Sequence, residues 1–229
     1  MEEKTKELTQ RTGKIKRRER LYDSEEKFYD GLAAVGFHGK YGFINEDGRE
    51  IVEPQYDLVF TFCNGVAMVT KNNFYGIIDK EGKELVKPDS YDLMDYSEKN
   101  DLFNVRQNKK WGVIDRNGKI IVPVEYEIVG FCLKKDIVYI NKKGKYGLYN
   151  VKTRQKITNF KYKEIVAYSP KYALIKGKKG EGLINEKGQE IIPPEYDDIY
   201  ANKDGTFKVV KYEYFNANGE KLISPVTTE

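Results

Sequence analysis

Apolar residues fall in short runs along the chain, and clusters of polar residues, glycine and proline separate them. The runs are rich in β-branched and aromatic side chains and are clearest at residues 66–69 and 173–175. After residue 30, no window long enough for a helix places its apolar residues at helical spacing. Runs of this kind, bounded by turn-forming residues, are typical of β-strands. The pattern therefore predicts an all-β chain built from strands of about four to six residues.

The strand pattern repeats about every 35 residues. Six copies align on a motif in which an aromatic residue precedes a glycine, and Asn or Asp follows three residues later. The glycine position falls at 42, 76, 112, 147, 182 and, in a decayed copy, 213. A fixed period is the sequence signature of a repeat architecture. The motif positions are Tyr41, Gly42, Tyr75, Gly76, Trp111, Gly112, Tyr146, Gly147 and Gly182.

The residues after this motif also recur. In five copies the Asn or Asp is followed three residues later by Gly, which predicts a type I turn with the glycine in the left-handed conformation. The fourth copy, residues 150–154, lacks the glycine and is one residue longer, so its turn must differ. A β-branched strand follows, then a proline that we expect to end it. A tyrosine comes next, mostly followed by Asp, at Tyr56-Asp57, Tyr91-Asp92, Tyr126, Tyr162 and Tyr196-Asp197.

Each recurring residue has a structural explanation. Glycine inside a strand weakens it, so its recurrence predicts that another backbone or a ring packs against that spot. The preceding aromatic residues point to the opposite face and would form a ladder between copies. The tyrosine of each Tyr-Asp pair is expected to bury its ring while its hydroxyl finds a polar partner.

These motifs resemble the WG-repeat family of bacterial proteins, also described as the WG beta repeat or KWG repeat. The resemblance covers roughly residues 31–225, although only Trp111-Gly112 shows the literal dipeptide. It implies a β-rich repeat module with a structural or protein-interaction role and no known reaction.

Two architectures fit about six copies of a hairpin or meander unit. One is an open, twisted array, and the other is a closed six-bladed β-propeller. The short period favours the open array. However, the last copy stops before its Tyr-Asp part, and residues 21–30 resemble that missing part, so an N-terminal segment would be able to close a ring. We expect a leader at 1–30, with a partial repeat at 21–30, and a single repeat domain at 31–229.

The net charge of +4 resides in the leader. Residues 1–20 hold eight basic and four acidic side chains, so the remaining residues are neutral overall. The leader has no helical stripe and is interpreted as a solvated tail or frayed helix. Polyanion or nucleic-acid binding is therefore expected only through the leader, at Lys14, Lys16, Arg17, Arg18 and Arg20.

Residues able to support catalysis or metal binding are scarce. The one histidine, His38, lies at an expected hairpin tip, and Cys63 and Cys132 are interpreted as small buried residues of a reducing compartment. The glycine-rich segment 177–182 lies in an expected hairpin, not between a strand and a helix. Arg106, Gln107 and Lys134-Lys135-Asp136 break the repeat pattern and are interpreted as surface variation. We predict no catalytic, cofactor-binding or metal-binding residues.

The sequence therefore predicts a non-enzymatic module for protein–protein interaction or scaffolding. Its partner would be a protein, selected by the loops between each Tyr-Asp pair and the next strand. The alternative is a small-ligand-binding or hydrolytic propeller-like protein, and a weaker one is polyanion binding by the leader. No apolar run is long enough for a transmembrane helix, and no secretory signal is recognisable, so we expect a cytoplasmic protein.

Overall fold

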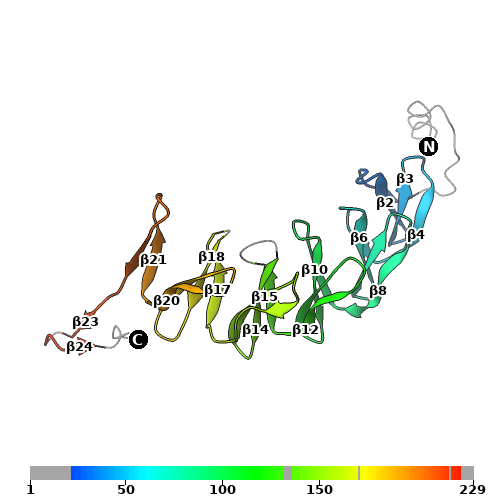
Figure 1. The fold of residues 1–229 in the computed structure, drawn as a ribbon. Helices are drawn as coiled ribbons and strands as arrows, with labels where there is room; N and C mark the ends of the chain where they lie inside the picture. Colours follow the sequence, from blue (N-terminus) through cyan, green and yellow to red (C-terminus); the bar gives the residue numbers. More distant parts are fainter. Residues whose placement is uncertain (1–21, 132–135, 170, 217, 223–229) are drawn as a thin grey trace. The chain divides into compact units, whose positions relative to one another are not determined.

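The computed structural model describes residues 22–131, 136–169, 171–216 and 218–222 (Figure 1). Their regular structure consists of antiparallel β-strands. No helix in these ranges is long and apolar enough to cross a membrane. The predicted polyanion contacts of the leader, together with Cys132, Lys134 and Lys135, lie outside the described residues.

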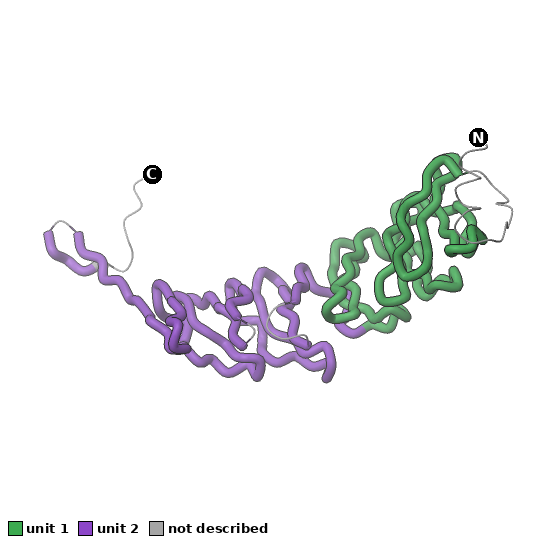
Figure 2. The backbone as a smooth tube through the Cα atoms, turned by 90° about the horizontal axis from the view of Figure 1, so that it is seen from above, with its two compact units in different colours: residues 1–120 green, residues 121–229 purple. Residues whose placement is uncertain are grey.

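The chain forms two compact units, residues 1–120 and 121–229 (Figure 2). The strands of the first unit are β1 (Ser24–Glu25), β2 (Leu32–Phe37), β3 (Lys40–Asn45), β4 (Glu50–Tyr56), β5 (Leu58–Val59), β6 (Val66–Lys71), β7 (Phe74–Asp79), β8 (Glu84–Tyr91), β9 (Leu93–Ser97), β10 (Leu102–Gln107) and β11 (Lys110–Ile114). Strands β1 to β4 and β5 to β8 form two four-stranded sheets in chain order, and β9, β10 and β11 pair consecutively.

Strand β12 (Ile120–Tyr126) lies at the start of the second unit. The strands that follow are β13 (Ile128–Phe131), β14 (Ile137–Lys142), β15 (Lys145–Asn150), β16 (Gln155–Lys156), β17 (Glu164–Ala167), β18 (Tyr172–Lys176), β19 (Glu181–Asn185), β20 (Glu190–Tyr196), β21 (Asp198–Ala201), β22 (Phe207–Val210), β23 (Tyr214–Phe215) and β24 (Lys221–Leu222). Strands β13 to β16 and β17 to β20 form four-stranded sheets, whereas β21-β22 and β23-β24 form two-stranded ones.

Each four-stranded sheet lies between one recurring tyrosine and the next. Its second and third strands are joined by a two-residue turn in most copies, as in β6 and β7, where Lys71 pairs with Phe74. The turn residues Asn72 and Asn73 have φ angles of 52° and 67°, as a type I′ hairpin requires. The segment after Tyr22 supplies β1 to the first sheet, where Ser24 pairs with Gly36. The partial repeat expected at 21–30 thus contributes the first strand of a complete sheet.

The second strand of the first sheet is buried on both faces, which explains why it is an apolar run without alternation. In β2, Ala33 and Val35 pack on one face with Ile44 of β3. Leu32 and Ala34 face the other way and join a cluster that continues into the second sheet through Phe62, Ala67, Val69 and Ile78. A strand covered on both faces has no solvent side on which polar residues would alternate. The core therefore lies between consecutive sheets within each unit.

These findings confirm the predicted fold class. The chain is all-β, its repeats follow one another in tandem, and none of the sheets in the described ranges closes on itself, consistent with an open repeat array. The prediction that proline ends the fourth strand is wrong. Strand β4 continues through Pro54 to Tyr56, and β8 and β20 likewise contain their prolines.

Candidate interaction surface

The fourth strand accommodates proline because it bulges over the motif glycine. Tyr41 pairs with Tyr56 and Phe43 pairs with Val52, so residues 53–55 lie opposite Gly42 alone. Bulges and edge strands are where a sheet tolerates proline. A methyl group added at Gly76 would lie 2.6 Å from the carbonyl oxygen of Val86. The backbone predicted to pack against each motif glycine is therefore the bulge of its own sheet.

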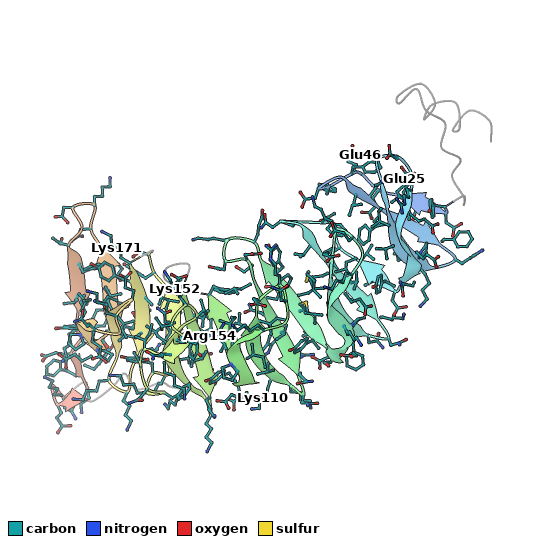
Figure 3. The ribbon with its side chains drawn as sticks, turned by 45° about the vertical axis from the view of Figure 1, so that its right-hand side comes forward. Glu25, Glu46, Lys110, Lys152, Arg154 and Lys171 are labelled. Atoms are coloured by element: carbon teal, nitrogen blue, oxygen red, sulfur yellow. The ribbon has the colours of Figure 1, made fainter. Side chains whose placement is uncertain are left out.

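The Asx turns form as predicted. The amide of Gly82 donates to the carbonyl of Asp79, whose Oδ1 also accepts the amides of Glu81 and Lys83. The turns at Asn45, Asp115, Asn185 and Asn216 also close through the amide of their glycine. In the fourth copy, Arg154, labelled in Figure 3, stands in place of the glycine. Its φ of 57° lies in the left-handed region.

The buried tyrosines join consecutive sheets through a bond that the sequence analysis missed. The hydroxyl of Tyr56 donates to Oε1 of Glu84 at 3.0 Å, and that of Tyr162 donates to Glu190 at 2.7 Å. Tyr22 makes the same bond to Glu50 at 2.6 Å. Each acceptor lies 28 residues after its tyrosine, at the start of a fourth strand. The sequence contains this Tyr-to-Glu spacing three times, but only the structure shows that the two side chains form a hydrogen bond.

Ionisation in these pairs follows from their contacts. Burial, reinforced by the neighbouring carboxylates, raises the pKa of Tyr56 and of Tyr162. The Lys161 ammonium donates to Glu190 and lowers its pKa, and the Tyr162 hydroxyl adds to this effect. Burial also raises the pKa of Tyr126 to about 12, with the nearby Glu125 carboxylate adding to it. These side chains carry structural bonds between or within sheets.

In the first two copies, the aspartate after the recurring tyrosine holds a hairpin turn. Oδ2 of Asp57 accepts the amide of Asn72 at 2.6 Å, and Asp23 binds the amide of His38 at 2.7 Å in the same way. Asp57 also pairs with Lys40 of the preceding sheet, and this bond lowers the pKa of Asp57. His38, with φ 49°, occupies the hairpin tip that the sequence predicts.

The motif aromatics contact residues of their own repeat. Tyr146 packs against Tyr139 at 5.9 Å between ring centroids. The guanidinium of Arg106 lies 5.7 Å from the Trp111 ring and pairs with Asp92. These contacts differ from the expected ladder between copies, and they give the pattern-breaking Arg106 a structural role. Cys63 is half-buried rather than buried, and its thiol pKa is raised mainly by burial.

The first strand of each sheet is the part that the repeat leaves variable. Its middle residue is buried, as at Val129, Ile165 and Ile199. The residue after this one changes identity from copy to copy: Phe60, Asp95, Gly130, Val166 and Tyr200. It is exposed at Val166 and Tyr200, whereas Gly130 lies beneath the Tyr139 ring, and the exposed apolar residue of β13 is Ile128, just before the buried one. In the second unit, Ile128, Val166 and Tyr200 are 41%, 44% and 51% exposed, and we call these three residues the first-strand edge.

This edge has the character of a binding surface rather than of a reaction centre. Strands β13, β17 and β21 lie at the ends of their sheets, so one side of each strand offers backbone groups for pairing. Within the described ranges, no cluster of three or more His, Cys, Asp or Glu side chains is arranged to hold a metal ion. The aromatic–glycine motif residues predicted from the sequence lie inside the sheets, on strands such as β3, β7 and β15, and are not part of this edge.

Comparisons with known proteins agree with the repeat pattern. The family model described as "WG containing repeat" matches residues 41–73, 75–111, 111–146 and 182–213, which is more than half of the chain. A search of the curated proteins found no match.

Among solved structures, a eukaryotic initiation factor is similar with a TM-score of 0.43 and 11% identity. The alignment covers 91% of this chain and 66% of the factor, so the chain spans slightly less than two thirds of that protein. Kluyveromyces lactis Hsv2p is similar with a TM-score of 0.38 and 10% identity over 84% of this chain and 74% of that one. Likenesses this low carry no argument about function. The matched repeats establish that the chain belongs to the WG containing repeat family.

Proposed function

We propose that this chain is a non-enzymatic binding module that takes up a protein partner along the first-strand edge. One observation carries the proposal. Turns, cradled glycines and Tyr–Glu bonds fix most repeated positions, whereas the outward positions of the first strands vary and expose apolar side chains. Repeat proteins commonly bind partners through surface positions that differ between otherwise equivalent units.

The edge offers two kinds of contact. Full burial of an apolar side chain is worth about 1.5–3 kcal/mol. Val166 is 44% exposed, so covering the rest of it against a partner is worth roughly half of that. The free side of β17 also has backbone donors and acceptors that an extended partner segment would pair with. Because the side chains differ between sheets, the three strands together would read a specific sequence of partner residues.

A matched pair of substitutions in one sheet tests the proposal. Val166→Lys changes the first-strand edge on β17, and Ile191→Lys changes the fourth strand β20 of the same sheet. The two side chains are 44% and 46% exposed, so the substitutions perturb folding to a similar degree. Affinity capture from the cells of origin, quantified by mass spectrometry, would compare both variants with the unchanged chain. Equal melting temperatures of the variants would confirm the match.

The expected result is a protein partner that is retained by Ile191→Lys and lost with Val166→Lys. Capture of this partner should also persist after nuclease treatment and after removal of residues 1–20. Retention of the partner by Val166→Lys would place the interaction elsewhere. Capture that depends on the leader and on nucleic acid would favour polyanion binding instead.

A further inference from the structure

The sixth copy departs from the architecture of the other copies. In the fifth copy, β18 pairs with β19 and β19 with β20, giving a continuous sheet. In the sixth, β22 pairs with β21 and β23 pairs with β24, but the described residues show no pairing between β22 and β23. The sheet is therefore split, and β22 and β23 each present an unpaired edge.

The split follows from a missing turn. The fifth copy pairs Tyr172 with Asn185 and Lys176 with Glu181, around a turn at residues 177–180. In the sixth copy, the pairing of Asp198 with Val210 corresponds to that of Glu164 with Lys176. The same register therefore places Val210 opposite Tyr212. Only Lys211 lies between them, so too few residues remain to form the turn.

A hairpin with a two-residue turn would then have to shift this register and turn at Tyr212 together with Lys211 or Glu213. Both turn residues would need positive φ, which the other copies give to pairs such as His38-Gly39 and Lys143-Gly144. The left-handed conformation costs a residue with a large side chain about 1–2 kcal/mol. Turn chemistry therefore opposes folding β23 back onto β22 of its own chain.

The chain instead runs on from β22 into β23 (Figure 1). Two bonds hold it at this point: the amide of Tyr212 donates to Asp197 Oδ2 at 2.6 Å, and its hydroxyl donates to Asp198 Oδ2 at 2.8 Å. Val209 and Phe215, on either side, remain 38% and 55% exposed. Within segment 207–216, β22 and β23 thus each have one strand edge that pairs with no other strand in the described residues.

We propose that residues 207–216 pair antiparallel with the same segment of a second copy of this chain. In the register of the other repeats, Phe207 of one copy lies opposite Phe215 of the other, and Val210 lies opposite Tyr212. This register is its own mirror, so a two-fold axis passes between the two copies of Lys211 and both copies make identical contacts. Each β22 then receives β23 from the other copy, which completes two sheets in the order of the preceding repeats.

The side chains suit this pairing. Val210 would lie opposite Tyr212, at the position where Arg106 lies opposite Trp111 in the third copy. Phe215, the more exposed of the two flanking residues, would lie opposite Phe207 and gain an aromatic neighbour. Lys208 would lie opposite Tyr214, and its aliphatic stem can cover that ring.

Mass measurement on the full chain tests the proposal. Light scattering or sedimentation should give twice the chain mass of 26.6 kDa. Insertion of Asn-Gly between Lys211 and Tyr212 gives Val210 and Tyr212 a three-residue loop that ends in glycine, as a common hairpin requires, and it should convert the dimer to a monomer with an unchanged β-sheet spectrum. The same insertion between Lys203 and Asp204, in the loop before β22, should leave the dimer intact. A monomer at every concentration up to the solubility limit would overturn the proposal, as would a dimer that persists after the insertion at 211.

Cross-linking tests the register. In a chain with Cys63 and Cys132 replaced by serine, Phe207→Cys combined with Phe215→Cys should form a disulfide between chains, seen as a doubled mass on a non-reducing gel. Phe207→Cys with Tyr214→Cys points the two thiols to opposite faces and should not cross-link. A disulfide confined to one chain, or equal cross-linking of both variants, would overturn the proposed pairing. Neither measurement depends on the partner proposed for the first-strand edge.

Discussion

Replacing Gly76 with alanine tests whether the bulge of the fourth strand requires a glycine beneath it. The added methyl would lie 2.6 Å from the carbonyl oxygen of Val86 and 2.9 Å from the nitrogen of Pro88. Both distances are shorter than a normal non-bonded contact of a carbon atom with oxygen or nitrogen. Both neighbouring atoms belong to the backbone, so they cannot move away as a flexible side chain would. The φ angle of Gly76 lies outside the left-handed region, so the expected cost is purely steric.

The magnitude follows from two opposing effects. Overpacking a tight site costs about 1–3 kcal/mol. Alanine also reduces the conformational entropy of the unfolded chain, which stabilises the folded state by about 0.4–1 kcal/mol. The net loss should therefore be about 1–2 kcal/mol, and a chain of this size loses about 2–4 °C in melting temperature for each kcal/mol.

The equivalent glycine of the fourth copy supplies the control. A methyl at Gly147 would lie 3.1 Å from the carbonyl oxygen of Thr158, where a small displacement relieves the contact. Gly147→Ala should accordingly change stability by less than about 0.5 kcal/mol, because the entropy gain offsets the remaining strain. Thermal unfolding followed by circular dichroism would compare the two variants with the unchanged chain. Equal melting temperatures, or a larger loss at Gly147, would refute the role assigned to the bulge.

Three further predictions concern bonds and turns. Tyr162→Phe removes the hydroxyl bond to Glu190 and should lower the free energy of unfolding in urea by about 1–2 kcal/mol. Tyr91→Phe is the control, because the residue 28 positions after Tyr91 is Lys119 and not a glutamate. A loss at Tyr162 no greater than that at Tyr91 would contradict the role of the bond. Glu190 has a lowered pKa, so its contribution to stability is complete above the unfolded value of about 4.3 and is lost as pH falls through the folded value. The melting temperature should therefore drop more steeply in acid than that of Glu190→Gln, and parallel curves would argue against this assignment. Lys109→Gly relieves a φ of 62° in a type I′ turn and should stabilise the chain by about 0.5–1 kcal/mol in the same assay, whereas a loss would show that the turn is unstrained.

Several features followed from the sequence because they depend on local chemistry. The Asx turns, the hairpin tip at His38 and the all-β class arise from residues close together in the chain, whose backbone preferences act before any packing. The recurring glycine also predicted a close approach of another backbone segment, since a glycine inside a strand usually marks a site where another group packs closely. The repeat made each of these inferences stronger by presenting it several times.

The remaining features required the tertiary structure because they join residues that no local rule relates. The bulge that carries Pro54 over Gly42 depends on a register shift between two strands, and the pairing of Tyr56 with Glu84 depends on how one sheet stacks on the next. The outward positions of the first strand became a candidate surface only when their neighbours proved to be buried. The sequence by itself determined which residues recur and what turns they form. The packing of sheet on sheet decided which of them are covered, because burial depends on neighbours that are distant along the chain.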